Sequence, residues 1–361
     1  GNGGNGNGNE IENGTILKGT ITSDVTLAAG NTYKLSGEYI VEEGATLHIE
    51  EGVKIIAVYD DIADYILVKQ GGKINAVGTP DKPIVMTSEK EEPGAWGGIH
   101  ICGRAHTNAE GGKGSSEIGG AVYGGNDDAD NSGTLQYIRL EYTGFAFDEE
   151  HEANGISFYG VGNGTIVDHC QAYKGSDDGF EFFGGSVNVS NLVAVSCSDD
   201  SFDWTEGWNG KGTNLVAYQE AESTLGYDCD CLMECDNNGS NNAATPVAHP
   251  VLKNLILVGN GGSKQGIRLR AGTEVEIDNA KVCGKGQPLT VETALTENAL
   301  KNGTSKLTNI TLTSELSCKE GIYTHADFIA VTSNKVDANL SYSSFEDIKK
   351  ECSWMNGSWV K

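Results

Sequence analysis

A short acidic motif that occurs twice at a fixed spacing constrains the fold of this chain more than any other feature. Residues 177–182 read DDGFEF and residues 199–204 read DDSFDW, so the two copies are offset by 22 residues (199 − 177 = 22). Self-similarity with such a period is typical of a solenoid, in which each repeat forms one coil. Residues 186–195, between the copies, alternate in polarity and are rich in β-branched residues, which predicts a strand. A 22-residue repeat that contains a strand and turns but no helix indicates one coil of a parallel β-helix.

Related segments extend this repeat into a column of rungs along the chain. Each has the pattern small, apolar, variable, apolar, and we expect the variable residue to point outward because side chains alternate along a strand. Phe180 and Phe202, which precede the variable position, are predicted to lie in the core. The rung at Leu232 is the least regular, since leucine replaces the small residue. The predicted outward residues are His100, Ser157, Glu181, Asp203, Glu234 and Arg268.

A second column, made of asparagines, supports the same stacking. Each asparagine opens an apolar run, and stacked amides can pass hydrogen bonds from coil to coil along the axis. Cys170 lies 22 residues before Leu192 and is therefore predicted to be an inward-facing thiol. The members of this column are Asn191, Asn214, Asn254, Asn279 and Asn309.

The chain is therefore predicted to be an all-β, right-handed, single-stranded parallel β-helix with three parts. Residues 1–13, rich in Gly and Asn, read as a flexible tether, and residues 14–345 as the β-helix, with an N-terminal β cap and a long insertion at about 103–133. Residues 346–361 are predicted to be a C-terminal cap. In it, Trp354 and Trp359 would cover the last rung.

Charge and cysteine usage narrow the classes of partner. The net charge of −26 argues against nucleic acid and anionic membranes, and no apolar run is long enough to span a bilayer. We therefore expect a monomer that binds carbohydrate or a surface protein. The nine cysteines show no CxxC pair and no zinc-binding spacing, and Cys318–Cys352 is the first candidate for a disulfide.

The insertion contains a candidate calcium loop. Residues 128–133 read DADNSG, which matches the first half of a calcium-binding loop, and the candidate ligands are Asp128, Asp130 and Ser132. The twelfth position of such a loop is Arg139 instead of glutamate, which excludes an EF-hand. A polar turn is the alternative interpretation.

Several stretches resemble a family of exported right-handed parallel β-helix proteins and lipoproteins of Bacteroidetes, with a pectate-lyase-like fold. They are residues 45–52, 71–79, 83–88, 96–99, 130–135 and 177–185. The resemblance implies the fold and export to the periplasm, outer membrane or cell surface, and it provides no catalytic residue. A tether at the start of the given sequence agrees with a removed signal peptide and an anchoring cysteine upstream.

The acidic column is the candidate site. Equivalent side chains on neighbouring rungs lie about 4.8 Å apart. Two carboxylates at that distance repel each other by roughly 3–4 kcal/mol at an effective dielectric constant of about 20. A bound cation, a raised pKa or a nearby base would offset this repulsion, and Arg268 and Arg270 lie on the next rung.

Three functions remain open, of which binding is preferred over catalysis. In the first, a glycan or protein binds along the column, with Glu181, Asp203 and Glu234 accepting hydrogen bonds and Phe183, Trp204 and Trp208 stacking on the ligand. In the second, the protein is a polysaccharide lyase or glycoside hydrolase. In the third, it is a stalk or adhesin body whose Asp-Asp pairs cap backbone N–H groups. The candidate catalytic residues are Glu181, Asp203, Glu234, Arg268 and Arg270.

Overall fold

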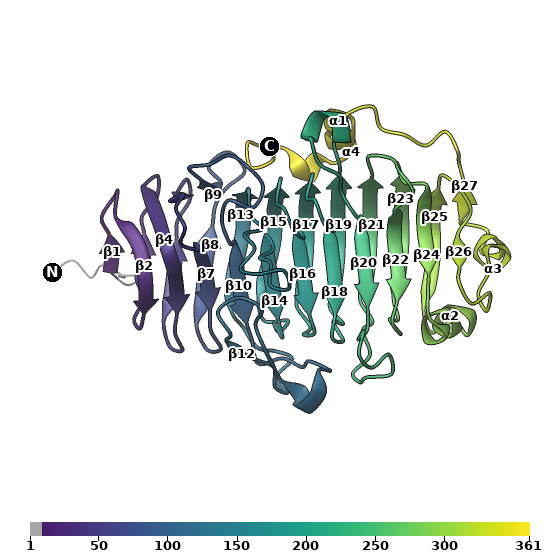
Figure 1. The fold of residues 1–361 in the computed structure, drawn as a ribbon, viewed down its shortest axis with the longest axis horizontal. Coiled ribbons are helices and arrows are strands. Elements are labelled where there is room, and N and C mark those ends of the chain that lie inside the picture. The colour runs from purple at the N-terminus through teal and green to yellow at the C-terminus, as the bar shows by residue number, and fades with distance from the viewer. Residues whose placement is uncertain (1–8) are drawn as a thin grey trace.

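The predicted right-handed parallel β-helix is confirmed. The structure, a computed structural model, describes residues 9–361. One continuous parallel sheet of 25 strands winds around a long axis, which runs horizontally in Figure 1. Most of the predicted tether, residues 1–8, lies outside the described residues. Asn9–Ile11 form strand β1, which pairs with β3 (Val25–Leu27), so the tether prediction is wrong for these three residues.

Each central coil contributes one short strand to a face that we call sheet 1. Its side chains alternate between the core and the outer surface. The strands of sheet 1, in part or whole, are β2 (Ile16–Ile21), β4 (Thr32–Val41), β7 (Tyr65–Val68), β10 (Ile99–Cys102), β14 (Ile156–Tyr159), β16 (Phe180–Phe183), β18 (Phe202–Thr205), β20 (Met233–Asp236), β22 (Gln265–Arg270), β24 (Gln287–Val291) and β26 (Ser317–Cys318).

The same coil then continues as one long, bent strand whose two halves form sheets 2 and 3. Early coils use separate short strands instead: β5 (Thr46–Ile49) and β8 (Lys73–Val77) in sheet 2, β6 (Lys54–Ala57) and β9 (Ile84–Ser88) in sheet 3. The bent strands are β13 (Gly133–Glu141), β15 (Ile166–Tyr173), β17 (Asn188–Val195), β19 (Lys211–Tyr218), β21 (Val251–Val258), β23 (Glu276–Cys283) and β25 (Lys306–Leu312), and β27 (Lys335–Val336) ends the stack.

The predicted asparagine column lies at the bend of these long strands, and we call it the Asn ladder. Its members adopt positive φ angles, from 53° to 64°, which asparagine tolerates better than most residues. Asn214 Nδ2 donates to Asn191 Oδ1 at 2.9 Å, and the pattern continues from Asn254 to Asn214 and from Asn279 to Asn254. Asn309 departs from it, because its amide donates to Asp278 Oδ1 at 2.7 Å.

Replacing Asn214 by alanine should destabilise the protein by about 2–3 kcal/mol, since it removes two ladder hydrogen bonds and leaves a Cβ-bearing residue in left-handed backbone. Asn214→Gly removes the same bonds without the backbone strain. We expect urea denaturation to show the glycine variant about 1–2 kcal/mol more stable than the alanine variant. Equal stabilities would contradict the strain argument.

The insertion packs on the outer face of sheet 1 at its N-terminal half. It carries the hairpin β11 (Gly114–Ser115) and β12 (Val122–Tyr123) and the short helix η1 (Glu110–Gly112). Ile118 and Tyr123 are buried against Tyr159 and Phe183 of sheet 1. The insertion therefore covers the outward row that lies next to the column, formed by Cys102, Tyr159 and Phe183.

The prediction that the last 16 residues cap the final rung is wrong. The cap is formed by α2 (Ala294–Lys301) and α3 (His325–Ala330), whose Phe328 is buried in the main core. After α4 (Phe345–Glu351), the tail and η2 (Ser353–Met355) run back along the side of the β-helix. Trp359 packs edge-on against Tyr137, and the chain ends near the middle of the molecule (Figure 1).

All nine cysteines are free thiols. Cys318 packs against the main core and Cys352 lies in the cluster under the C-terminal tail, so the predicted Cys318–Cys352 disulfide is not formed. Cys170 is buried and pairs in register with Leu192, as predicted.

We expect a thiol-reactive reagent to modify few cysteines in the native protein, because eight are buried and only Cys318 is half-buried. After unfolding without reductant, all nine should react, as counted by intact mass. A count of seven after unfolding would show that a disulfide forms in solution.

Candidate functional site

The acidic column has the register that the repeat predicts. Ser157 pairs with Glu181, Glu181 with Asp203, and Asp203 with Glu234, each on neighbouring parallel strands of sheet 1. Arg268 follows Glu234. Residues on either side of these positions point into the core, where Phe180 and Phe202 stack at 5.6 Å between ring centroids. The irregular rung at Leu232 is therefore aligned correctly.

One glycine column explains why the rung pattern begins with a small residue. A Cβ on Gly179 would lie 2.6 Å from the backbone oxygen of Ser201 on the next coil. Gly155 and Gly266 have the same relation to the coils that follow them. Coils stack too closely at this turn for most side chains.

His100 and Ser157, predicted to point outward, are completely buried. Tyr65 packs edge-on against His100, whose Nε2 contacts the backbone oxygen of Gly97 at 2.6 Å. Asn154, in the loop before β14, donates to Ser157 Oγ at 2.9 Å. Burial lowers the pKa of His100 to about 4, so this histidine is neutral. The accessible part of the column therefore begins at Glu181.

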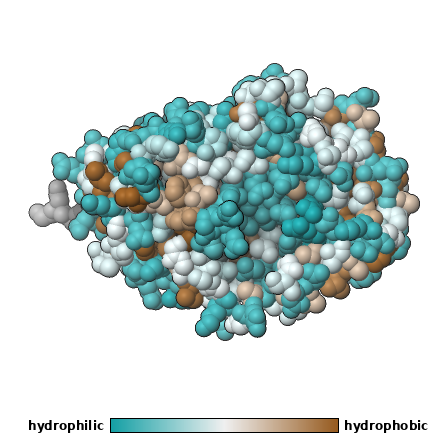
Figure 2. Space-filling view, in the orientation of Figure 1, coloured by the Kyte–Doolittle hydropathy of each residue, from teal (hydrophilic) through white to brown (hydrophobic). Residues whose placement is uncertain are grey.

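Figure 2 shows a hydrophilic region over the middle of the molecule, where the open part of the column lies. Glu181 and Asp203 are half-buried, and the side chain of Glu234 is 19% exposed. These carboxyls lie below the outer surface but remain reachable. On the N-terminal side, the insertion places Glu117 near enough for its charge to contribute to the raised pKa of Glu181.

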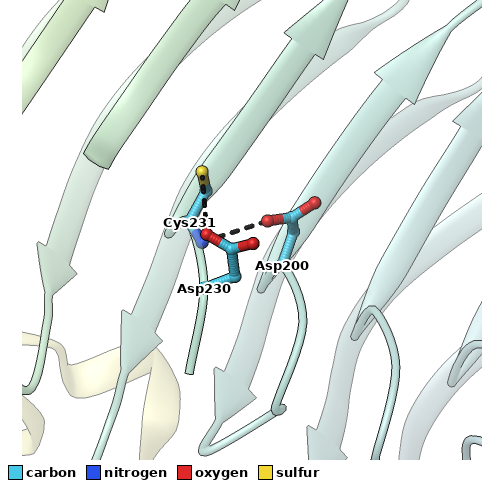
Figure 3. A group of neighbouring side chains, drawn as sticks. All are labelled: Asp200, Asp230 and Cys231. Carbon is cyan, nitrogen blue, oxygen red and sulfur yellow. Dashed lines mark hydrogen bonds between the residues drawn. The ribbon is translucent and has the colours of Figure 1, made fainter. Parts of the chain in front are cut away.

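Of the four aspartates in the two Asp-Asp pairs, two form a row of hydrogen bonds that links successive coils. Asn154 Oδ1 accepts from the backbone N–H of Asp178 at 3.3 Å, and Asp178 Oδ1 accepts from Asp200 at 3.0 Å. Asp200 Oδ1 accepts in turn from the backbone N–H of Cys231 at 3.0 Å (Figure 3). These contacts confirm backbone capping for Asp178 and Asp200.

The other oxygens of this region face one another. Within the described residues, ligand atoms of Asp178, Glu181 and Asp203 lie within 4.8 Å of each other, as do those of Asp200, Asp203 and Glu234. Oδ2 of Asp200 is buried without a hydrogen-bond partner. Asp177, Asp178 and Asp199 form a third group of this kind. Such sets of carboxylate oxygens are the ligands that could hold a hard cation.

Burial shifts the titration of these groups upward. For Asp203, burial and then the charge of Glu181 raise the pKa well above its ordinary value. For Glu181, burial and then Glu117 raise the pKa to about 8. For Asp177, burial and then a hydrogen bond with Asp199 raise it to about 10. The cluster therefore retains protons at neutral pH, which relieves the repulsion expected between neighbouring rungs.

Two arginines close the C-terminal end of the column, as predicted. Arg270 contacts Glu234 at 2.6 Å and Asp236 at 2.7 Å. Arg268 lies 3.7 Å from Glu234 and 3.2 Å from Glu292. Glu234 is therefore paired with positive charge, whereas Glu181 and Asp203 contact mainly other acids and Asn154. Along the column, the N-terminal carboxyls lie among other acids, whereas the C-terminal carboxyl forms ion pairs with arginine.

The three aromatic residues predicted to stack on a ligand do not offer open faces. Trp204 and Trp208 are 1% exposed and lie in the main core, where Trp208 stacks on Phe182 at 4.1 Å. Phe183 points outward but is covered by the insertion and stacks on Tyr159. The prediction of surface stacking platforms is therefore wrong for these residues.

The candidate calcium loop is held by other contacts. Asp128 Oδ1 lies 2.9 Å from Nδ1 of His106 and also accepts the backbone N–H of that residue. The backbone N–H of Ser132 donates to Thr165 Oγ1, and the side chain of Ser132 is buried. Asp130 is half-buried, and burial raises its pKa. These contacts fit a polar turn, and calcium binding here stays a prediction.

Sequence reasoning missed three parts of the site. Asn154, which donates to Glu181 Oε1 at 2.9 Å, precedes a rung but carries no motif of its own. Glu117 reaches the column from the insertion, and Asp230 approaches Asp200 from the loop before β20. The equivalence of Asn154 with Asp178 and Asp200, each two residues before an inward position, was the available signal.

The fold and this site define a parallel β-helix protein with a recessed acidic column on one lateral sheet. The pectate-lyase-like β-helix domain family matches residues 19–361, so the chain belongs to this family. Comparisons with curated proteins and with solved structures find no match. Such a domain is consistent with a protein that binds carbohydrate or acts on polysaccharide. Within the described residues, no helix is long and apolar enough to cross a membrane.

Proposed function

We propose that the protein binds a carbohydrate along the open part of the acidic column, from Glu181 to Arg270. The observation that carries this proposal is the in-register row of partly exposed polar side chains on four neighbouring strands of sheet 1. Rows with a spacing of about 4.8 Å provide repeated hydrogen-bonding groups for a linear polymer. An exported, cell-surface location is part of this proposal and rests on the family resemblance.

The protonation pattern supports a glycan as the ligand. A protonated carboxyl both donates and accepts hydrogen bonds, as a sugar hydroxyl does. With a pKa of about 8, Glu181 keeps its proton at neutral pH. A strongly anionic ligand would instead find its counter-charges already engaged, since Arg270 is paired with Glu234 and Asp236. Neutral glycans therefore fit the column better than polyuronates.

One observation favours a second candidate, polysaccharide cleavage. Two carboxyls on one face with different surroundings are the arrangement from which acid–base catalysis is built. Glu181 is the proton donor in this reading, and the second carboxyl is Glu234, which lies two rungs away and forms an ion pair with Arg270. The second candidate predicts that a bound glycan is shortened on incubation.

A glycan array tests the proposal. The wild-type protein should bind at least one class of neutral glycan, and Glu181→Met/Asp203→Leu, which removes the donors and acceptors of both side chains, should lose that signal. Asp61→Leu/Glu315→Met, which makes the same two kinds of replacement at exposed carboxylates outside the column, is the control. Unchanged binding by the column variant would exclude the column as the binding site.

A further inference from the structure

A groove on another side of the molecule lies between the Asn ladder and the C-terminal tail. Its volume is about 350 Å³, which falls within the range of small-molecule sites. One wall consists of three ladder residues, Asn214, Asn254 and Asn279, and the other contains Trp354 and Glu351. The groove exists because the tail runs back along sheet 3 instead of capping the last coil.

The ladder wall retains unused hydrogen-bonding capacity. An asparagine amide has two N–H donors and an oxygen with two lone pairs. The ladder bond between neighbours uses one N–H and one lone pair at Asn214 and at Asn254. Each of these amides therefore has one donor and one acceptor left beyond the ladder. These sets of one free donor and one free acceptor recur along the groove at the rung spacing of about 4.8 Å.

The opposite wall supplies an aromatic ring and balanced charge. Trp354 is half-buried, whereas the other four tryptophans are at most 1% exposed. Lys281 Nζ lies 3.3 Å from Glu351 Oε2, so the two charges of the groove neutralise each other. Tyr342 donates to the same carboxylate at 3.0 Å.

We propose that this groove binds a neutral oligosaccharide. Sugar hydroxyls are donors and acceptors at once, which matches the amide pairs, and the apolar C–H face of a pyranose packs on an indole ring. The paired charges give no preference for an anionic or cationic ligand. The inference rests on the carbohydrate function proposed above but concerns a separate site, because none of the groove residues belongs to sheet 1.

Tryptophan fluorescence provides the test. In the native protein, acrylamide should quench mainly Trp354, since the other indoles are buried. The probes are hexasaccharides of β-1,4-glucose, α-1,4-glucose, β-1,4-xylose, β-1,4-mannose and β-1,4-N-acetylglucosamine. We expect at least one to reduce the quenching constant about twofold in a saturable manner. No reduction with any of the five would overturn the proposal.

A matched pair of variants in the Asn ladder tests whether the oligosaccharide that protects Trp354 binds in the groove. Asn279→Gly removes a groove amide, and Asn191→Gly removes a ladder amide that does not line the groove; glycine tolerates the positive φ at both positions. Asn279→Gly should weaken the apparent affinity about fivefold, the effect of one lost hydrogen bond. Asn191→Gly should change it less than about twofold. Equal effects of the two variants would contradict the proposed location.

The column variant separates this proposal from the first one. Glu181→Met/Asp203→Leu should leave the protection of Trp354 unchanged, even where it abolishes binding on the array. Protection that disappears in the column variant would overturn the groove proposal, because the ligand would then bind at sheet 1. Protection that persists while the column variant binds glycans normally would support the groove and contradict the column.

Discussion

Replacing Asp203 by asparagine should reduce the pH dependence of the protein's stability by about one proton. In the unfolded chain, these carboxyls ionise near pH 4. In the folded protein, burial and then the neighbouring acids keep Asp203 protonated to a much higher pH, and burial raises the pKa of Glu181 to about 8. The folded state therefore binds more protons than the unfolded state across this range. The free energy of unfolding must then fall as pH rises.

Each extra proton contributes a slope of about 1.4 kcal/mol per pH unit. We expect the wild-type protein to lose stability from about pH 5 to about pH 8, and Asp203→Asn to reduce the slope by about one proton. Urea denaturation at several pH values, with a chelator present so that no cation replaces the protons, measures both slopes. Asp347→Asn, at the start of α4 where a hydrogen bond from Ser343 lowers the aspartate pKa, is the control and should run parallel to wild type. An Asp203→Asn curve parallel to wild type would show that the cluster is ionised in the folded protein.

Replacing Trp208 by alanine should destabilise the protein by about 3–5 kcal/mol, the cost of removing a large aromatic side chain from a core. Trp208 is 1% exposed, stacks on Phe182 and donates from Nε1 to the backbone oxygen of Val187 at 3.1 Å. A surface stacking platform would instead change stability by about 0.5 kcal/mol or less.

The control for this experiment is Trp354→Ala, which removes the half-buried indole of the C-terminal tail. It should cost about 1 kcal/mol. Urea denaturation followed by circular dichroism measures both variants without relying on indole fluorescence. Similar losses for the two tryptophans would contradict the assignment of Trp208 to the core.

The fold was predictable because it depends on local repetition. The 22-residue offset, the outward column and the Asn ladder are each visible within neighbouring coils, and the pairing register follows them residue by residue. The alternation that placed Phe202 inward also places Trp204 inward, two positions later. The same rule therefore excludes Trp204 as a stacking platform on the surface.

The coverings of the β-helix were less predictable, since they depend on contacts between distant parts of the chain. The tail reaches Gln171, whose side chain accepts from the backbone of Lys361 at 2.7 Å, and nothing in either segment indicates this partner. The insertion was recognised by length, but its burial of Phe183 depends on how Ile118 and Tyr123 pack. Sequence therefore indicated which residues form the column and could not show which of them remain open.

From the sequence, a raised pKa in the cluster is only one of three ways to offset the repulsion between neighbouring carboxylates. The spacing of strands fixes the distance between carboxyls, but their pKa values depend on burial, which the insertion and the loops largely determine. Arg268 and Arg270 lie on the expected rung, yet they pair with Glu234, Asp236 and Glu292 and leave Glu181 among other acids.

The central claim, that the open column binds a carbohydrate, is tested most directly by calorimetry with the neutral glycan that binds best on the array. Wild-type protein, Glu181→Met/Asp203→Leu and the exposed-carboxylate control should be titrated at neutral pH. We expect the column variant to bind the glycan at least about tenfold more weakly, which is the effect of two lost hydrogen bonds, and the control to match wild type. Equal affinities for all three proteins would contradict it.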